Sequence, residues 1–165
     1  MFREMRRKKQ VLSRTEAEEI LKKHTSGVLA VAGDDGYPYT VPLNYVYCDS
    51  VIYFHCARTG HKLDAIAQND KVSFCVVDKD TIVAEEYTTY FRSVIAFGRA
   101  RVLEKEDEKR AALERLAEKY SPDQPEGRQK EIEQQFKNVC MVEIAIEHLS
   151  GKEAIELVRA KENRK

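Results

Sequence analysis

The segment Thr59-Gly60-His61-Lys62 has the residue types that a phosphate site needs. A phosphate requires backbone N–H groups directed at it and a nearby cation, and the N-terminus of a helix supplies such N–H groups. Gly60 lets the backbone come close to a ligand. Lys62 stands in the first turn of an expected helix, where its charge opposes the helix dipole, and binding of a dianion explains that placement. The alternative is that His61 and Lys62 are only solvent-exposed.

A second segment, Val41-Pro42-Leu43-Asn44-Tyr45, reads as a strand interrupted by proline. Proline cannot donate to a strand ladder, so this strand is expected at an edge or a bulge, with backbone groups free for a ligand. Leu43 and Tyr45 offer an apolar wall for a flat ring, and neighbouring backbone groups offer polar contacts. The alternative is an ordinary amphipathic edge strand.

A third segment, Tyr90 to Gly98, is apolar on both faces near its start. Burial on both faces in so short a chain suggests packing against a second subunit as well as the chain's own core. Arg92 and Ser93 stand at the entrance of this strand, where they suit contact with a ligand at the interface. The alternative is a central core strand with Arg92 in a local salt bridge.

Other familiar chemistries lack support in the sequence. No H-E-x-x-H, P-loop, G-x-G-x-x-G or nucleophile-elbow pattern occurs, so metal chemistry and covalent hydrolysis are not predicted. Two histidines, His55 and His61, border the proposed phosphate turn. The four cysteines have neither C-x-x-C pairing nor zinc-like spacing and are expected as buried thiols; they are Cys48, Cys56, Cys75 and Cys140.

The periodicity predicts a mainly β fold with peripheral helices. About six strands joined mostly by tight turns indicate an antiparallel sheet closed into a small barrel with helices outside. Ser13 followed by Glu16 forms a capping box that begins a helix over 13–25, and residues 39–47 are expected to form one strand. Helix 106–120 is expected to bury Ala111, Leu113, Leu116 and Ala117, whereas residues 79–87 give no clear pattern. The predicted organisation is a basic arm over 1–12, one domain over 13–152, and a charged tail over 153–165, which is mobile or lies against a neighbour.

The charge composition disfavours two classes of binding partner, nucleic acids and anionic membranes. Lysine plus arginine and aspartate plus glutamate each number 28, so the formal net charge is zero and no field favours nucleic acid or an anionic membrane. No signal-peptide pattern and no apolar run of bilayer length appear, and a cytoplasmic protein is expected.

Five blocks in order resemble the 5-nitroimidazole-resistance (Nim) family of the pyridoxamine-phosphate-oxidase-like split barrels, which bind flavin mononucleotide (FMN). The blocks are VPLNYVY (41–47), IYFHCARTGHKLD (52–64), VSFCVV (72–77), YFRSVIAFGRARVL (90–103) and IEHLSGK (146–152). The resemblance implies a six-stranded antiparallel split β-barrel and a homodimer with FMN at the interface. One departure is that no arginine-rich substrate-phosphate pattern of the vitamin B6 oxidases appears near the C-terminus.

The resemblance also assigns roles to residues. The strand carrying Pro42, Leu43, Asn44 and Tyr45 would line the flavin, with His55, Cys56 and Ala57 beside its ring and ribityl chain; Gly60, His61 and Lys62 would hold the phosphate, and Arg92 and Ser93 would approach from the partner. In some members the histidine matching His55 is linked to catalysis. The resulting hypothesis is an FMN-dependent oxidoreductase that reduces a small electron-poor substrate, nitroreductase-like, with NADH or NADPH as a candidate donor. The alternatives are a flavin-binding or redox-sensing module without turnover, and a haem-binding split barrel.

Overall fold

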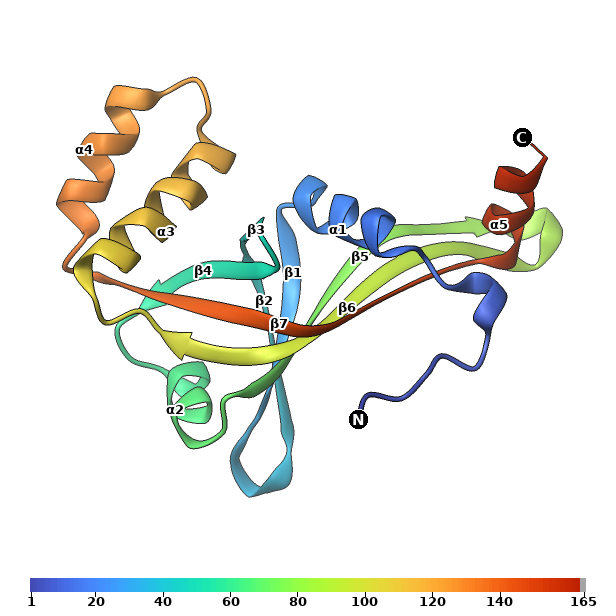
Figure 1. Ribbon diagram of the computed structural model, residues 1–165, viewed down its shortest axis with the longest axis horizontal. Helices are drawn as coiled ribbons and strands as arrows, with labels where there is room; N and C mark the ends of the chain where they lie inside the picture. The colour runs from blue at the N-terminus through green and yellow to red at the C-terminus, as the bar shows by residue number, and fades with distance from the viewer. Residues whose placement is uncertain (164–165) are drawn as a thin grey trace.

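The computed structural model describes residues 1–163. Figure 1 shows a long twisted sheet with helices at its ends and on its faces. The helices are α1 (Arg14–Lys23), α2 (His61–Gln68), α3 (Glu106–Tyr120), α4 (Pro125–Gln135) and α5 (Ile155–Glu162), with 3-10 turns η1 (Lys8–Gln10), η2 (Asp34–Gly36) and η3 (Ala84–Glu86). The strands are β1 (Ser26–Ala32), β2 (Pro38–Asn44), β3 (Val46–Cys48), β4 (Val51–Ala57), β5 (Lys71–Val83), β6 (Thr88–Val102) and β7 (Val139–Glu153).

All neighbouring strands are antiparallel, in the order β2-β1-β5-β6-β7-β4-β3. The fold is therefore mainly β, as predicted, but the described residues form seven strands rather than six. The extra strand arises because the expected single strand 39–47 is interrupted at Tyr45, between β2 and β3. The sheet curls without closing: β2 and β4 approach each other across the barrel but share no hydrogen-bonded register.

Local sequence signals account for several boundaries. The predicted capping box begins α1, since the side chains of Ser13 and Glu16 each bond the other's backbone N–H. The Asp-Gly turn after β1 reverses the chain through positive φ angles at Asp35 (54°) and Gly36 (79°). Pro42 lies on β2, an edge strand paired only to β1, which confirms the edge position that proline requires.

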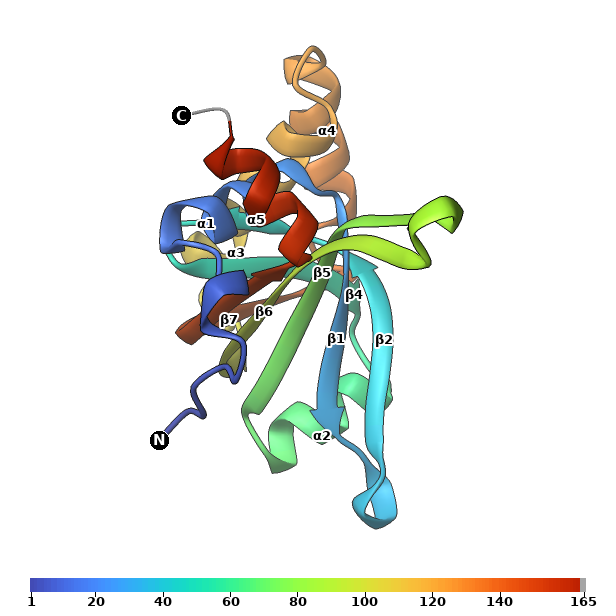
Figure 2. The ribbon, with the colours of Figure 1, turned by 90° about the vertical axis from the view of Figure 1, so that its right-hand side faces the viewer.

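The segment 79–87, which gave no pattern, forms most of a protruding hairpin. Both β5 and β6 extend past the body of the barrel and turn through η3 (Figure 2). At its tip Ile82 is 79% exposed and Tyr87 is 98% exposed. The strands are thus longer than predicted, because pairing between two arms of a hairpin needs no apolar alternation against a core. We call residues 78–92 the hairpin arm.

Helices α3 and α4 form an antiparallel pair beside the open end of the barrel (Figure 1). A small second core joins them to the start of β7, separate from the barrel core. On α3 the buried residues are Ala112, Leu113 and Leu116, and Ala111 is exposed. The predicted inward position of Ala111 is therefore wrong by one residue.

The two terminal segments pack on the domain. Gln10 and Leu12 are buried, and Val11 bridges to Lys152, so the end of the predicted basic arm is folded onto the domain. The predicted tail contains α5, whose Lys161 amine pairs with Glu16 and Glu153. Of the two expectations for the tail, the structure shows that it lies against its neighbours, as far as residue 163. No helix among the described residues has the length and apolarity that crossing a membrane requires.

Candidate ligand-binding site

The turn between β4 and α2 combines a glycine in an unusual conformation with the start of a helix. Gly60 has φ +142°, a value that side-chain-bearing residues rarely adopt, and the space on its Cβ side is open. Its carbonyl accepts hydrogen bonds from Leu63 and Asp64, so the N–H groups of His61 and Lys62 precede the first intrahelical bonds. These two N–H groups are free to bind an anion at the N-terminus of α2.

Lys62 adds the cation that the turn requires. Its side chain is half-buried, and within residues 1–163 no carboxylate forms an ion pair with it. Arg58 on the same turn donates only a long bond to the Lys137 carbonyl, at 3.4 Å. The turn therefore offers the charge of Lys62 without a paired carboxylate, which fits a phosphate group.

His61 is held against the β1–β2 hairpin. Its ring stacks on Tyr39 with centroids 4.2 Å apart, and its Nε2 lies 3.5 Å from Oδ2 of Asp34. These contacts fix the direction of the imidazole along the hairpin. His61 thus offers its backbone N–H at the turn, whereas its ring already has partners.

The cysteine beside this turn is half-buried and faces another cysteine. Cys56 on β4 is the register partner of Cys140 on β7, and all four cysteines of the chain are free and half-buried. Burial, with a smaller contribution from Cys140, raises the pKa of the Cys56 thiol to about 11, although the nearby Lys62 acts in the opposite direction. Cys56 is accordingly a neutral thiol at physiological pH and a poor nucleophile.

Strand β2 presents alternate residues to opposite sides. Pro42 and Asn44 are exposed, and Leu43 is half-buried against the barrel core. Tyr45 is fully buried: its hydroxyl donates to the Leu21 carbonyl and its ring meets Phe74 edge-on. The prediction that the Tyr45 ring forms a ligand wall is therefore wrong, because the chain leaves β2 at this residue and turns the ring into the core.

His55 and Asn44 meet at one cavity. His55 is exposed on β4, opposite Met141, and Asn44 ends β2 with its amide donating to the Thr25 carbonyl. Both residues line a cavity of about 540 Å³ between the barrel and the helical hairpin of α3 and α4. We call it the hairpin cavity after these two helices; it is separate from the hairpin arm. Ala57 ends β4 between His55 and the turn and is exposed, so β4 leads from the hairpin cavity to the phosphate turn.

Within one chain, Arg92 and Ser93 lie far from His55 and from the phosphate turn. His55 is opposite Met141 on β7, whereas Ser93 is opposite Lys152, which is about 35 Å further along that strand. Arg92 pairs with Asp78 at 3.3 Å and with Glu153 at 2.9 Å. The alternative of a local salt bridge is thus confirmed for Arg92, and its side chain is not free to bind a ligand.

An apolar surface on the outward face of the sheet extends from Pro42 on β2 to the strand that carries Ser93, β6. Strand register places Pro42, Val28, Cys75 and Ile95 side by side across β2, β1, β5 and β6. Val28 and Ile95 are each 38% exposed, and Val77, opposite Ser93 in the next row, is 58% exposed. We call this apolar surface the outer face.

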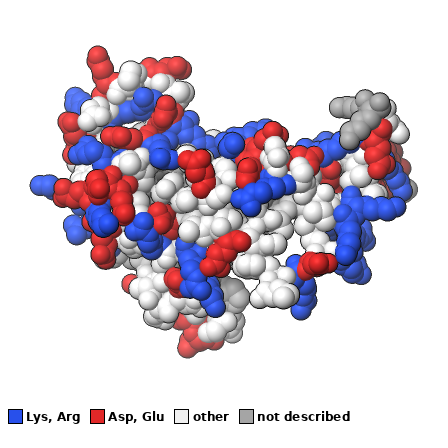
Figure 3. Space-filling view, viewed as in Figure 1, with Lys and Arg blue, Asp and Glu red and all other residues white. Residues whose placement is uncertain are grey.

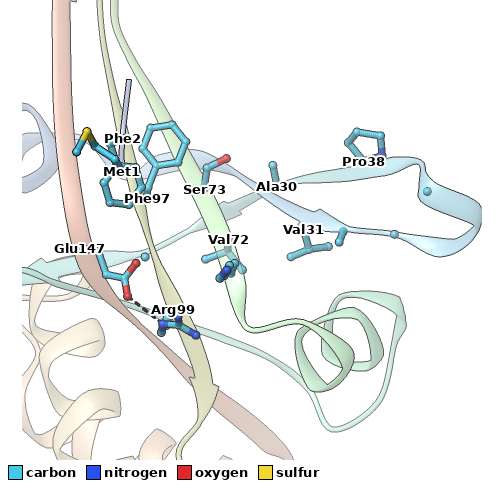
Figure 4. A pocket seen from close by; sticks show the side chains of 15 residues that line it. Met1, Phe2, Ala30, Val31, Pro38, Val72, Ser73, Phe97, Arg99 and Glu147 are labelled. Carbon is cyan, nitrogen blue, oxygen red and sulfur yellow. Dashed lines mark hydrogen bonds and ion pairs between the residues drawn. The ribbon is translucent and has the colours of Figure 1, made fainter. Parts of the chain in front are cut away.

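A cavity of about 670 Å³ lies on the same outer face, near the N-terminus. Figure 4 shows Phe2 beside Phe97, with Ser73 and Ala30 next to them on β5 and β1. The ring of Phe2 also stacks on His148, with centroids 4.7 Å apart. No predicted site residue lines this cavity, although it is the larger of the two.

Several residues of the hairpin cavity were missed by sequence reasoning, which treated α3 and α4 only as outer packing. They are Leu113, Leu116, Ala117, Tyr120, Ser121, Glu131, Ile132, Gln135 and Val139. The available signal was weak: a pair of helices inserted between two long strands, with Ser121-Pro122 turning the chain between them. Among residues 1–163 no cluster of three or more metal-ligating side chains occurs.

The curled but unclosed sheet, with its seam between β2 and β4, defines a split β-barrel. The family model described as pyridoxamine 5'-phosphate oxidase matches residues 13–153, and the chain belongs to that family. A Bacteroides thetaiotaomicron protein assigned to 5-nitroimidazole antibiotic resistance is 23% identical over 86% of this chain and 85% of its own, with a TM-score of 0.72. An FAD-binding protein from Mesorhizobium loti is 25% identical over 88% of this chain and 97% of its own, with a TM-score of 0.66.

A third relative is the FAD and haem binding protein of Mycobacterium smegmatis, 21% identical over 88% of this chain and 73% of its own, with a TM-score of 0.73. A search of proteins with curated functions gives no match. The predicted relation to the pyridoxamine-phosphate-oxidase-like split barrels is confirmed.

Proposed function

We propose that this chain binds FMN, with the flavin phosphate at the turn formed by Gly60, His61 and Lys62. The observation that carries the proposal is the open, left-handed Gly60 at the start of α2, next to a half-buried lysine with no carboxylate partner in the described chain. Two free N–H groups, a helix N-terminus and one cation match the donors that a phosphate dianion takes. The FAD-binding relative of the same fold supports a flavin as the ligand class.

The seam between β2 and β4 suits the remainder of the cofactor. As an edge strand, β2 leaves backbone groups unpaired on one side, and these can bond the polar edge of a flat ring. Pro42 and Asn44 belong to β2, and Cys56 and Ala57 end β4, the strand that leads to the phosphate turn. Because no carboxylate pairs with Lys62 within the described residues, its charge is available to the phosphate.

When bound, FMN supplies hydride and electron transfer, here toward a small electron-poor substrate and from NADH or NADPH. The chain's part is to position the two partners and to manage protons. The exposed imidazole of His55 stands where the seam opens into the hairpin cavity. A ring nitrogen of His55 can donate a proton to the reduced substrate.

We propose further that two copies pair through the outer face, as a homodimer. This surface exposes Val28, Val77 and Ile95 in neighbouring rows, and the hairpin arm extends beyond it with Ile82 exposed. Apolar area of this kind is stabilised by burial against a second subunit. Pairing is also what can bring Ser93 of one copy near the flavin of the other, because the two regions are distant within one chain.

Substitution at Ser93 tests the homodimer. Ser93→Trp places a large ring on the outer face and is expected to lower both dimer formation and flavin content, measured by light scattering coupled to size exclusion and by absorbance. Lys22→Trp, on the exposed side of α1, should change neither. A fully flavinated dimer of Ser93→Trp would remove Ser93 from any shared site.

The bound chromophore tests the proposed function as a whole. Purified protein, or protein mixed with FMN and desalted, is expected to keep a flavin absorption band and to oxidise NADH or NADPH with a nitroaromatic acceptor. A flavin band without turnover on a broad acceptor panel would favour the non-catalytic or redox-sensing module. A Soret band in place of a flavin band would establish the haem-binding alternative and reject the proposal.

A further inference from the structure

The geometry points to the hairpin cavity as the acceptor site, selective for uncharged, largely apolar aromatic molecules such as quinones. This inference rests on the proposed function, because it names the substrate class of the site beside the flavin seam. It assigns specificity to α3 and α4, two helices that lie outside the predicted cofactor site.

The size and lining of the cavity support a small apolar ligand. Its volume of about 540 Å³ lies within the range of about 300–1,000 Å³ typical of small-molecule sites. Most of the wall is hydrophobic, from both helices and the start of β7. The wall residues are Leu113, Leu116 and Ala117 of α3, Ile132 of α4, and Val139 of β7.

The wall is held in place by its own packing. Leu113, Leu116 and Ile132 are more than nine-tenths buried, and Leu113 and Ile132 belong to the second core. At the end of α3 the Tyr120 hydroxyl donates to the carbonyls of Thr25 and Tyr45, which ties the helix to the barrel. The cavity is therefore built into the fold, and a ligand need not order the helices in order to bind.

The charges around the cavity exclude anions. No lysine or arginine belongs to its lining, and the one charged lining residue is Glu131. The nearby cations point elsewhere: Lys119 donates to the carbonyls of His24 and Tyr45, and Arg128 donates to those of Ser121 and Pro122. A phosphate or carboxylate would enter a largely apolar space without a lysine or arginine as counter-ion, which is unfavourable. A substrate such as pyridoxamine phosphate is therefore a poor fit to this cavity.

The polar groups are confined to a few places on the wall. His55 and Asn44 come from the barrel side, and Ser121 and Gln135 from the helix side. A neutral acceptor with one or two carbonyl or nitro oxygens can therefore be oriented by hydrogen bonds while its ring rests on the aliphatic wall. The imidazole of His55 is the group among these that can also transfer a proton.

Paired ligands and paired variants test the inference. Menadione and the anionic naphthoquinone sulfonate share a ring system and differ in charge, and their affinities are measured by calorimetry with FMN-loaded and FMN-free protein. Menadione is expected to bind about tenfold or more tightly than the sulfonate. Ala117→Phe fills the cavity and should weaken menadione about tenfold or more, whereas Ala111→Phe, on the exposed side of the same helix, should have no effect.

A second variant, which changes charge, keeps the test valid if Ala117→Phe misfolds. Gln135→Arg places a cation at the cavity, on an exposed position of α4. It should raise the affinity for the sulfonate and leave the affinity for menadione unchanged. Equal affinities for the two quinones in the natural protein, or menadione binding unchanged in Ala117→Phe, would overturn the inference. Failure to take up FMN, seen by absorbance, would reject the proposed function instead, and quinone binding to the FMN-free protein would still report on the cavity.

Discussion

The two ends of the long sheet treat charge in opposite ways. At the end near α1 and α5, Asp78 is 6% exposed and is bonded by His24 at 2.7 Å, Lys23 at 3.1 Å and Arg92 at 3.3 Å. Glu153, 4% exposed, joins the same cluster through Arg92 and Lys161. We call this cluster the paired network. At the other end, the turn at Gly60 leaves a half-buried lysine and two helix N–H groups unpartnered within the described chain.

We infer from this difference that charge stabilises the fold at one end of the sheet, whereas at the other end it is available for the ligand proposed above. The paired network ties α1, β5, β6, β7 and α5 together, and each buried carboxylate in it has at least two cationic partners. At the open turn no carboxylate pairs with Lys62 within residues 1–163, so its charge stays available to water or to an anion. Arg92 and Lys62 therefore have different roles although both are cations beside apolar strands. On the face in Figure 3, charges of both signs are intermixed over α3 and α4.

Breaking the paired network should produce the largest effect on stability. Asp78→Ala leaves Arg92 and His24 without their shared carboxylate, and we expect a loss of about 3–5 kcal/mol in the free energy of unfolding. Chemical denaturation measures it. Asp80→Ala, two residues along β5 and exposed, is the matched control and should change stability by less than about 0.5 kcal/mol. A small loss for Asp78→Ala would mean that the network contributes little to the fold.

Removing the lysine at the open turn should act on the ligand rather than on the fold. Lys62→Ala deletes one charge-assisted phosphate contact, worth about 1.5–3 kcal/mol, which corresponds to about a 10- to 150-fold loss of FMN affinity. Titration followed by flavin fluorescence measures the affinity, and Lys22→Ala on α1 is the control. Without FMN, Lys62→Ala should unfold at the same denaturant concentration as the FMN-free natural protein. Unchanged FMN affinity would show that the phosphate does not lie at this turn.

The sequence predicted well what depends on short-range rules. The capping box at Ser13, the edge position of Pro42, and a turn followed by a helix at Gly60 each follow from one or a few neighbouring residues. The antiparallel sheet and the split-barrel class followed from turn spacing and from the resemblance. These features agree with the structure because local backbone preference and the final fold coincide there.

What the sequence could not predict depends on partners distant in the chain. Tyr45 is buried because it contacts Leu21 and Phe74. Arg92 is paired because Asp78 and Glu153 lie beside it, and Glu153 is 61 residues away in the sequence. The hairpin cavity requires α3 and α4 to stand beside the barrel seam, which no local pattern specifies. The hairpin arm was missed because its strands pair with each other and carry no core-facing alternation.

Acid should weaken the paired end of the sheet by a smaller amount, and in a defined window. The amine of Lys161, opposed by partial burial and aided by bonds from Ser13, lowers the pKa of Glu16 from its ordinary value of 4.5 to about 2. Burial acts to raise the pKa of Asp78, but bonds from His24 and Lys23 outweigh it, so that pKa is also lowered. A carboxylate whose pKa is lower in the folded state adds stability above its unfolded value and loses it as the pH falls toward its folded value.

For Glu16 the window therefore runs from pH 4.5 down to about 2. Its side chain is 40% exposed, so solvent screens the pair, and we expect its contribution to be about 1 kcal/mol or less. Denaturation midpoints across this window measure the slope, and Glu16→Gln should flatten it, whereas Glu19→Gln on the same helix should not. An identical slope in Glu16→Gln would mean that Lys161 is paired through Glu153 alone, and that α5 docks on the barrel without the contact to α1.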